Sequence, residues 1–259
     1  MSVFCEVYDF YSSFNGEKGV IGNSFFGLPI FYMAVKKTEY PKIIVQYAIH
    51  AREYITTYLA LKQIEDFNKN GSFGSAYFIP LMNPDGVNIC EGDRPLYKAN
   101  GRGVDLNVNF DALWGRGESN VYYKCDQNYV GKFAFSETET QALRDFTIRV
   151  KPQATVSYHA KGEVIFWEFF QDKEKKKLHK KLAKNVSKVT GYKIRSSKNS
   201  TGGYKDWCVE KLGIPALTIE VGDDKLNHPL KLDALDDIYK KNKRVIEEVI
   251  ETVKEITWN

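Results

Sequence analysis

Three apolar segments of the chain each end on a side chain that can bind a metal ion or move a proton. These segments are Lys42–His50, Ala154–His159 and Ala216–Glu220. Short apolar runs of this kind are typical of buried β-strands, and here they alternate with stretches of helical periodicity. The alternation predicts an α/β fold with a mixed, mostly parallel central sheet and helices on both faces.

Length and composition agree with one folded domain. The chain has 259 residues, which is long for one domain, but α/β enzymes commonly fill this length with a single core. Hydrophobic residues make up 43%, with 16 Phe and 16 Tyr, which is enough for a large core and excludes general disorder. We therefore expect a single catalytic domain over residues 1–259.

Local signals predict the remaining elements. Glycine and proline within Val20–Ile30, followed by Ile30–Val35, predict a hairpin at the sheet edge, and Ala76–Pro80 predicts a further strand. Further expected elements are helices over Glu53–Phe67, Ser136–Ile148, Asp172–Thr190 and Leu235–Ile256, a capping box of Ser136 and Glu139, a turn at Asn83-Pro84-Asp85-Gly86, and a long functional loop over Asn88–Lys132.

The charge pattern argues against nucleic acid as a partner. The formal net charge of +4 is too small to mark a nucleic-acid binder unless a patch concentrates it. The candidate patch is Lys173–Lys188, in which apolar residues recur at helical spacing at Leu178, Leu182, Val186 and Val189. We expect its lysines to occupy the solvated face of a helix.

The cysteines and the amino terminus indicate the cellular compartment of the protein. Cys5, Cys90, Cys125 and Cys208 show no metal-binding or disulfide spacing, which fits reduced thiols in a cytosol. The first residues lack the basic start and apolar run of a signal peptide, and no segment approaches ~18 apolar residues. We expect a cytoplasmic protein without a membrane partner. The sequence leaves its oligomeric state open.

The ends of the three apolar segments predict a metal site. Side chains at the carboxyl ends of parallel strands converge on a common crevice. Catalytic zinc takes three protein ligands, often two histidines and a glutamate, and leaves one position to water. His50, Glu53 and His159 form such a set and predict one zinc ion per chain. Glu220 is the candidate base for the attacking water.

Each of these residues has a simpler explanation when it is taken alone. A histidine three residues before a glutamate, as at His50 and Glu53, often arises by chance beside a helix start. His159 could be a core histidine with satisfied hydrogen bonds, and Glu220 could be a salt-bridged strand end. Three polar residues at the ends of three apolar strands are harder to explain separately.

Six segments, in this order along the chain, carry a family resemblance. They are His50-Ala51-Arg52-Glu53, Asn83-Pro84-Asp85-Gly86, Gly103-Val104-Asp105-Leu106-Asn107, Ser157-Tyr158-His159, Gly202-Gly203-Tyr204-Lys205-Asp206-Trp207 and Thr218-Ile219-Glu220. With them the chain resembles the zinc metallocarboxypeptidases, the carboxypeptidase A-like peptidases, from about Val20 onward. The resemblance implies zinc on His50, Glu53 and His159, with Glu220 as general base and acid.

The resemblance also implies a cation that stabilises the oxyanion of the reaction. Lys98, after Tyr97, is similar in position to the arginine of the family's aromatic–arginine pair. Arg102 and Arg94 are nearby candidates for the same role. Each of them could instead be a solvent-exposed charge on a loop.

The departures from the family pattern concern the substrate. Where the family has an arginine that clamps the terminal carboxylate after Asn107, this chain has Val108, which cannot donate a hydrogen bond. Lys198 stands where the family places a mobile tyrosine. Tyr204 is expected near the pocket. Lys205 occupies the position that sets the preference for the substrate side chain in the family. A cation there favours an anionic group on the substrate, unless the lysine points to solvent.

Among the branches of the family, the segment Tyr158–Trp167 is similar to bacterial γ-D-glutamyl–diaminopimelate peptidases. This likeness implies hydrolysis of γ-D-glutamyl-(meso)diaminopimelate bonds in murein peptides, with Asn107, Tyr204 and Lys205 as substrate-binding residues. Two alternatives remain: a conventional metallocarboxypeptidase that removes C-terminal, perhaps acidic, residues, and a non-catalytic zinc-containing peptide-binding module. Val108 argues against the first, and the intact Glu220 argues against the second.

Overall fold

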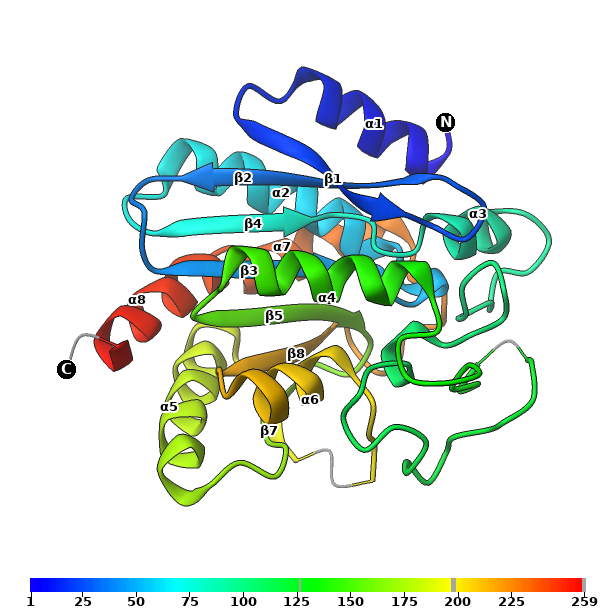
Figure 1. The fold of residues 1–259 in the computed structure, drawn as a ribbon. Coiled ribbons are helices and arrows are strands. Elements are labelled where there is room, and N and C mark those ends of the chain that lie inside the picture. Colours follow the sequence, from blue (N-terminus) through cyan, green and yellow to red (C-terminus); the bar gives the residue numbers. More distant parts are fainter. Residues whose placement is uncertain (126, 197–198, 258–259) are drawn as a thin grey trace.

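The computed structural model describes residues 1–125, 127–196 and 199–257, so Lys198 lies outside the described residues. Its centre is one eight-stranded sheet with the order β1-β2-β4-β3-β5-β8-β6-β7 (Figure 1). The strands are β1 (Glu17–Asn23), β2 (Pro29–Lys36), β3 (Lys42–Tyr47), β4 (Ser75–Ile79), β5 (Ala154–Ala160), β6 (Val164–Phe166), β7 (Lys193–Arg195) and β8 (Ala216–Val221).

The four central strands, β4, β3, β5 and β8, run parallel to one another, and β6 and β7 also form a parallel pair. The β1–β2, β2–β4 and β6–β8 pairs are antiparallel. The mixed, mostly parallel sheet predicted from the sequence is therefore confirmed, and so is an opening hairpin with β1 at the edge.

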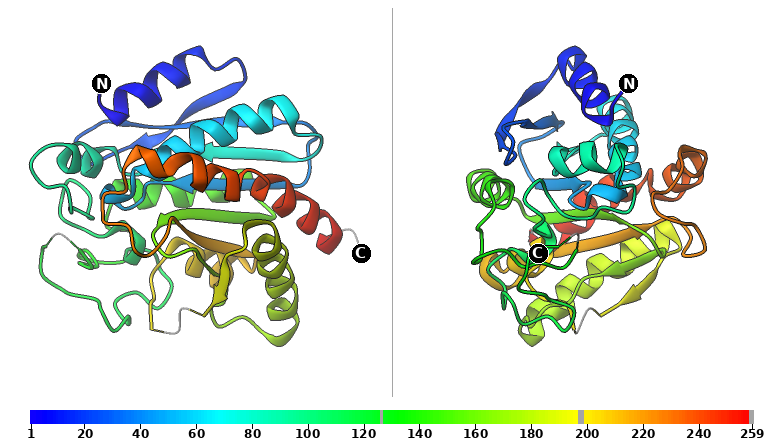
Figure 2. Two further views of the ribbon diagram at one scale, coloured as in Figure 1. Left: turned by 180° about the vertical axis from the view of Figure 1, so that it is seen from behind. Right: turned by 90° about the vertical axis from the view of Figure 1, so that its right-hand side faces the viewer.

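Helices cover both faces of the sheet (Figures 1 and 2). They are α1 (Val3–Ser13), α2 (Ile55–Asn70), α3 (Pro84–Glu91), α4 (Thr138–Val150), α5 (Lys173–Thr190), α6 (Tyr204–Trp207), α7 (Leu235–Asn242) and α8 (Val245–Thr257). Short helical turns span Ala51–Glu53, Leu106–Val108, Cys208–Leu212 and Leu232–Ala234.

Two hydrophobic cores hold these layers together. Alternate residues of a strand point to opposite faces, so Ile43 and Val45 of β3 pack with α2, α5, α7 and α8, while Ile44 packs with α4 and α6. The central strands are buried on both faces, which is why they are continuous apolar runs in the sequence.

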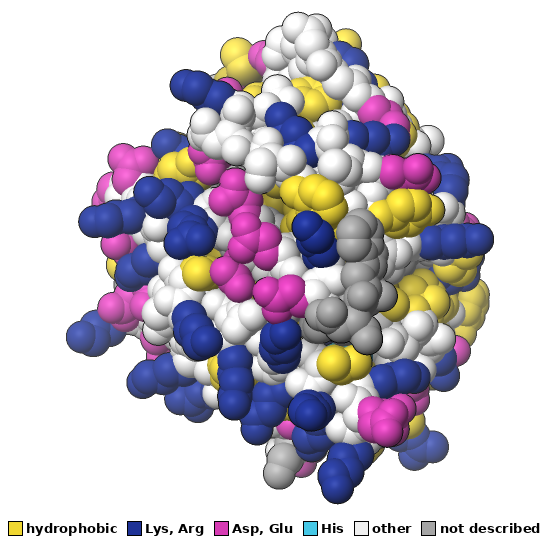
Figure 3. Space-filling model, turned by 90° about the vertical axis from the view of Figure 1, so that its left-hand side faces the viewer, with side chains coloured by type: hydrophobic (Ala, Val, Ile, Leu, Met, Phe, Trp, Pro, Cys, Tyr) yellow, Lys and Arg dark blue, Asp and Glu magenta, His cyan; other side chains and the backbone are white. Residues whose placement is uncertain are grey.

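Helix α5 accounts for the lysine-rich segment. Its Leu182 and Val186 are fully buried, while Leu178 is 40% exposed. The lysines therefore lie mainly on the solvent side, as predicted. Figure 3 shows lysines and arginines interspersed with acidic side chains on one face of the molecule. No helix in the described ranges is long and apolar enough to cross a membrane.

The predicted turn at Asn83–Gly86 is wrong, because the chain begins helix α3 there. The Asn83 side chain accepts a hydrogen bond from the Gly86 amide at 3.0 Å, as an N-cap residue does. Pro84 occupies the first helical turn, where its missing N–H costs nothing. The same residues that suit a turn also suit a helix start.

The predicted capping box is also wrong. Helix α4 begins at Thr138 with Glu137 as its N-cap. The Ser136 hydroxyl instead donates to the Glu137 carboxylate at 2.7 Å, and Glu139 accepts from the Phe25 amide at 3.1 Å. The Glu139 side chain therefore bonds to the distant Phe25 backbone and not to the start of its own helix.

The expected helix over Leu235–Ile256 is two helices, α7 and α8. The break follows Asn242, whose backbone carbonyl accepts from the Gln63 side chain at 2.9 Å. Its own side chain donates to the Tyr192 hydroxyl at 2.9 Å. This carbonyl is thus bound to α2 rather than to the next helical turn, which the sequence pattern does not show.

The packing predicts unequal effects of two leucine truncations. Leu59 of α2 is fully buried, so Leu59→Ala should lower the free energy of unfolding by about 2–5 kcal/mol. Leu178→Ala on α5, where the side chain is 40% exposed, should cost about 0.5 kcal/mol or less. Urea denaturation followed by circular dichroism measures both, and equal losses would contradict the assigned core.

Candidate metal centre and active site

Three chain segments bring the candidate ligands together. His50 lies three residues beyond β3, directly before the helical turn Ala51–Glu53 that carries Glu53. His159 is on β5, next to the last residue of the strand. All three side chains are buried, with exposures of 7% for His50, 3% for Glu53 and 1% for His159.

The ligand atoms of these residues converge on one point. His50 Nδ1 lies 2.9 Å from Glu53 Oε1, His159 Nδ1 lies 3.0 Å from Glu53 Oε2, and the two Nδ1 atoms are 3.1 Å apart. The three groups form a possible metal site, with all ligand atoms within 4.8 Å of one another. Two imidazoles and one carboxylate are a donor set that zinc prefers, so the residues fit this metal.

The charges of the site keep Glu53 ionised. Burial alone would raise the pKa of Glu53, but the adjacent His50 and His159 outweigh it and hold that pKa well below its ordinary range. Burial disfavours the charged form of His50, yet Glu53 and Asp105 raise its pKa overall. An ionised Glu53 is the form that a cation needs.

Asp105 orients His50 from the other side. Its Oδ1 lies 3.2 Å from His50 Nε2, and its Oδ2 lies 2.7 Å from Lys98 Nζ. Burial would raise the pKa of Asp105, but Lys98 and His50 together keep it well below its usual value. Such a carboxylate fixes the ring so that Nδ1 faces the metal position. The sequence pattern did not predict this role for Asp105, although an acid two residues before Asn107 was the available signal.

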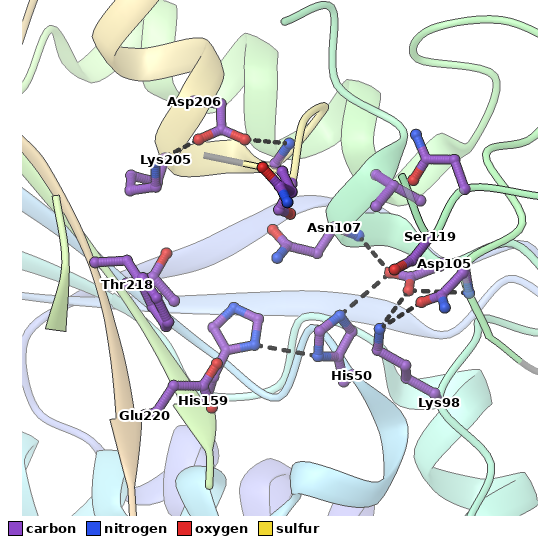
Figure 4. Close-up of a pocket in the computed structure, with 17 residues that line it drawn as sticks. His50, Lys98, Asp105, Asn107, Ser119, His159, Lys205, Asp206, Thr218 and Glu220 are labelled. Atoms are coloured by element: carbon purple, nitrogen blue, oxygen red, sulfur yellow. Dashed lines mark hydrogen bonds and ion pairs between the residues drawn. The ribbon is translucent and has the colours of Figure 1, made fainter. Parts of the chain in front are cut away.

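Glu220 lies directly beside His159. Strands β5 and β8 run parallel, and His159 pairs with Glu220 in their register. Both line a pocket of about 340 Å³ together with His50 (Figure 4). Burial raises the pKa of Glu220 to about 7, with Glu53 adding to the effect and His159 opposing it. A carboxyl with this pKa can both accept and donate a proton near neutral pH.

Of the three candidate cations, Lys98 is the one placed at the pocket. It lines the wall and donates to Asn128 Oδ1 at 3.1 Å as well as to Asp105. Arg102 is not among the lining residues: it pairs with Glu137 at 3.7 Å and stacks on Phe25. Arg94 lies over the Tyr97 ring. The structure therefore places Lys98 at the pocket, and does not place Arg102 or Arg94 among its lining residues. The catalytic role of Lys98 stays a prediction.

The residues expected to bind substrate divide into two groups. Asn107 and Lys205 line the pocket, as does Val108, which was not expected to bind substrate. Tyr204 does not: it is fully buried, and its hydroxyl lies 2.8 Å from Thr147 Oγ1 in the core. The expectation that Tyr204 lines the pocket is wrong because the first turn of α6 points this side chain toward α4.

Lys205 lies within the pocket rather than in solvent. It is 5% exposed, donates to the Glu168 carbonyl at 3.0 Å, and forms an ion pair with the Asp206 carboxylate. Asp206, 3% exposed, also accepts from the Gly203 amide at 3.1 Å. Figure 4 shows this pair at one end of the pocket and Lys98 at the other, with His159 and His50 between them.

Comparison with known proteins agrees with this geometry. A model of the family described as zinc carboxypeptidase matches residues 13–251. The chain belongs to the zinc carboxypeptidase family. Members of this family use zinc, and the group of His50, Glu53 and His159 is compatible with it.

One relative of the chain is named as an endopeptidase. The chain is 27% identical to gamma-D-glutamyl-L-diamino acid endopeptidase 1 of Lysinibacillus sphaericus over 85% of its own length and 64% of that relative. The chain thus spans slightly less than two thirds of this relative.

Solved structures confirm the carboxypeptidase fold. Bovine thrombin-activatable fibrinolysis inhibitor, in complex with tick carboxypeptidase inhibitor, matches with a TM-score of 0.87 at 22% identity over 99% of this chain and 98% of that chain. Murein-tripeptide amidase MpaA from Escherichia coli O157 matches with a TM-score of 0.65 at 18% identity over 95% of each chain.

The ligand assignment predicts which histidine controls zinc content. His159→Ala removes one of three ligands and should lower the bound zinc from about one per chain to near zero after dialysis. His179→Ala on α5 removes another buried histidine, 2% exposed and outside the group, and should leave zinc content unchanged. Atomic absorption of the purified variants measures this. Full zinc content in His159→Ala would refute the assignment.

Proposed function

We propose that the protein is a zinc peptidase that hydrolyses γ-D-glutamyl-(meso)diaminopimelate bonds in murein peptides. The observation that carries the substrate assignment is the buried ion pair of Lys205 and Asp206 in the same pocket as His50, His159 and Glu220. Support comes from the likeness to an endopeptidase named for γ-D-glutamyl-L-diamino acid bonds.

The chemistry follows from the residues around the metal position. When bound, zinc acts as a Lewis acid that polarises the scissile carbonyl and lowers the pKa of water. Glu220 takes the proton from the attacking water, and its raised pKa lets it pass that proton to the leaving amine. Lys98 stabilises the negative charge that develops on the carbonyl oxygen.

The pocket suits a diamino acid on the amine side of the scissile bond. Diaminopimelate carries a second amino acid centre, with one carboxylate and one ammonium, at the end of its side chain. Lys205 and Asp206 present one charge of each sign, both almost fully buried. Ionic hydrogen bonds in such a dry site are stronger than in water.

Val108 supports the same substrate assignment. It lines the pocket and is 8% exposed, and it cannot donate a hydrogen bond to a terminal carboxylate. Other lining residues carry neutral amides and hydroxyls, among them Asn107, Ser119 and Asn199. A substrate that depends on a clamp for its main-chain carboxylate would find none at Val108.

One observation favours a second candidate, a conventional metallocarboxypeptidase that removes acidic C-terminal residues. The ammonium of Lys205 would attract a glutamate side chain equally well. Asp206 opposes this candidate, because its carboxylate lies against Lys205 and would repel the same side chain. We therefore place the diamino acid first. A cytoplasmic setting remains a prediction.

The proposed base gives a prediction that separates catalysis from metal binding. Glu220→Gln should lower kcat for a γ-D-glutamyl-diaminopimelate dipeptide by about 10²-fold or more, because the amide cannot accept a proton. Its zinc content should stay at the wild-type level. Glu251→Gln on α8, an exposed glutamate, serves as the matched control. Unchanged turnover in Glu220→Gln would refute the mechanism.

The charge pair gives a prediction about substrate choice. Wild-type protein should hydrolyse the diaminopimelate dipeptide faster than γ-D-glutamyl-L-lysine, which lacks the second carboxylate, by about 10-fold or more in kcat/KM. Lys205→Met should remove most of this preference. Because the lone Asp206 charge would then be buried, the double variant Lys205→Met/Asp206→Asn controls for stability. Undiminished preference in both variants would contradict the assignment.

A further inference from the structure

Helix α5 concentrates the positive charge of the protein. It carries eight lysines and one glutamate, whereas the whole chain has a formal net charge of +4, so the rest of the chain is net acidic. The helix lies low on the left of Figure 1, and lysine and arginine side chains predominate in the lower part of Figure 3, which shows that side of the molecule. The structure describes all eight lysines, and none of them lines the pocket that contains His159 and Glu220.

Five of these lysines line a groove on the outer surface of α5. The groove has a volume of about 430 Å³, and its other lining residues are Leu178 and Asn185. Residues three or four apart on a helix are neighbours, and the exposed lysines of the groove follow this spacing: Lys177, Lys180, Lys181, Lys184 and Lys188. With a rise of about 1.5 Å per residue, the row of ammonium groups is roughly 16 Å long. The groove therefore presents a line of positive charges.

Acidic partners of this row are scarce. Lys181 pairs with Glu255 at 2.8 Å, in an ion pair whose side chains are 47% and 57% exposed. Within the part of the chain that the structure describes, the other four lysines of the groove form no ion pair. Like charges four residues apart on a helix repel each other, so α5 keeps a row of charges that lowers its own stability. A bound polyanion would remove this repulsion.

The type of cation indicates the type of anion. Of the residues described at the groove, five are lysines and none is an arginine. The planar guanidinium of arginine matches a carboxylate with two parallel hydrogen bonds, whereas the ammonium of lysine acts as a point charge. A point charge suits a phosphate group, whose charge is spread over oxygen atoms that point in different directions. A row of such charges suits a chain of phosphates better than a single ion.

Two other classes of anionic partner fit the groove less well. A helix that binds a lipid surface inserts an apolar face into it, but the apolar face of α5 packs in the core through Leu182 and Val186. Single-stranded nucleic acids are held by aromatic side chains that stack on the bases. Among the described residues that line the groove, none is aromatic.

We propose that this groove binds a linear polymer of phosphate groups that carries no bases. The polymer lies along α5, with successive phosphates against the lysines from Lys177 to Lys188. The groove and the catalytic pocket share none of their described lining residues, so a bound polymer leaves the pocket open to peptides. This binding surface is independent of the proposed function, because it retains the protein on a polyanion and takes no part in hydrolysis.

Binding is measured with two polymers that share this chemistry. Inorganic polyphosphate has phosphates joined directly, and poly(glycerol phosphate) has phosphates joined through glycerol. Isothermal titration calorimetry of the full chain should show saturable binding of at least one polymer, weakening about 10²-fold between about 50 and 200 mM salt as counterions are released. The tighter binder identifies the source of the phosphates. Binding of neither polymer at the lower salt concentration would overturn the inference.

A fourfold variant tests the groove itself. Its substitutions are Lys177→Gln, Lys180→Gln, Lys184→Gln and Lys188→Gln. Together they should weaken polymer binding by about 10²-fold and lower the slope of log affinity against log salt by about 3. Because they also remove repulsion within α5, the midpoint of thermal unfolding should not fall, which circular dichroism measures. Polymer binding at wild-type strength in this variant would refute the groove.

The matched control removes the same number of charges elsewhere. Its substitutions are at four exposed lysines outside α5: Lys69→Gln, Lys132→Gln, Lys225→Gln and Lys231→Gln. Polymer binding should change by no more than about threefold, because charges far from the polymer are screened by salt. Equal weakening in the two fourfold variants would mean that net charge alone attracts the polymer, and the inference would be wrong.

Competition with other anions tests the class of partner. Single-stranded DNA and vesicles that contain phosphatidylglycerol should each displace the polymer at least about tenfold less well at equal phosphate concentration. If either binds more tightly than both polymers, the partner belongs to that class and the proposal fails. Zinc content and peptidase activity should be the same in wild type and in both fourfold variants, because the groove is separate from the pocket.

Discussion

The register between β5 and β8 is the constraint on which the site depends. It places His159 directly opposite Glu220, so that a metal ligand and a proton acceptor lie side by side at one edge of the sheet. A slip by one residue would turn either side chain to the opposite face. Because strand residues alternate between the two faces of the sheet, such a slip would move apolar side chains out of the core in which they pack. The packing that stabilises the fold therefore also fixes how the ligand His159 lies relative to Glu220.

A second constraint is the pairing of buried charges at both ends of the pocket. Asp105 joins Lys98 to His50, so one carboxylate positions both the candidate oxyanion cation and a metal ligand. Lys205 and Asp206 neutralise each other at the far end. Removing one member of a buried pair leaves an uncompensated charge. These pairs hold the pocket in a charged state before any substrate arrives, which is the condition for electrostatic preorganisation.

The sequence predicted the parts of the structure that local pattern determines. Apolar runs that end on His159 and Glu220 located two strand ends, because central strands must be apolar on both faces. It could not show that Asp105 bonds to His50, since 55 residues separate them and only the fold brings them together. It also misplaced Tyr204, whose side chain points into the core, and the α7–α8 break, which a hydrogen bond from Gln63 explains. These two errors arise where a long-range contact overrides a local preference.

Charge recognition by Lys205 and Asp206 would give the protein a way to position an unusual amide. The carbonyl of a γ-glutamyl bond lies on a flexible side chain, so more rotational freedom must be lost before water can attack it. Contacts to the second amino acid centre of the diamino acid would restrict that freedom from the amine side of the bond. Binding energy from these remote groups can then be used to align the carbonyl with Glu220 and Lys98. In this arrangement no hydrogen-bond donor is required at Val108. The charged groups that anchor the substrate lie on the substrate's side chains and not at its main-chain terminus.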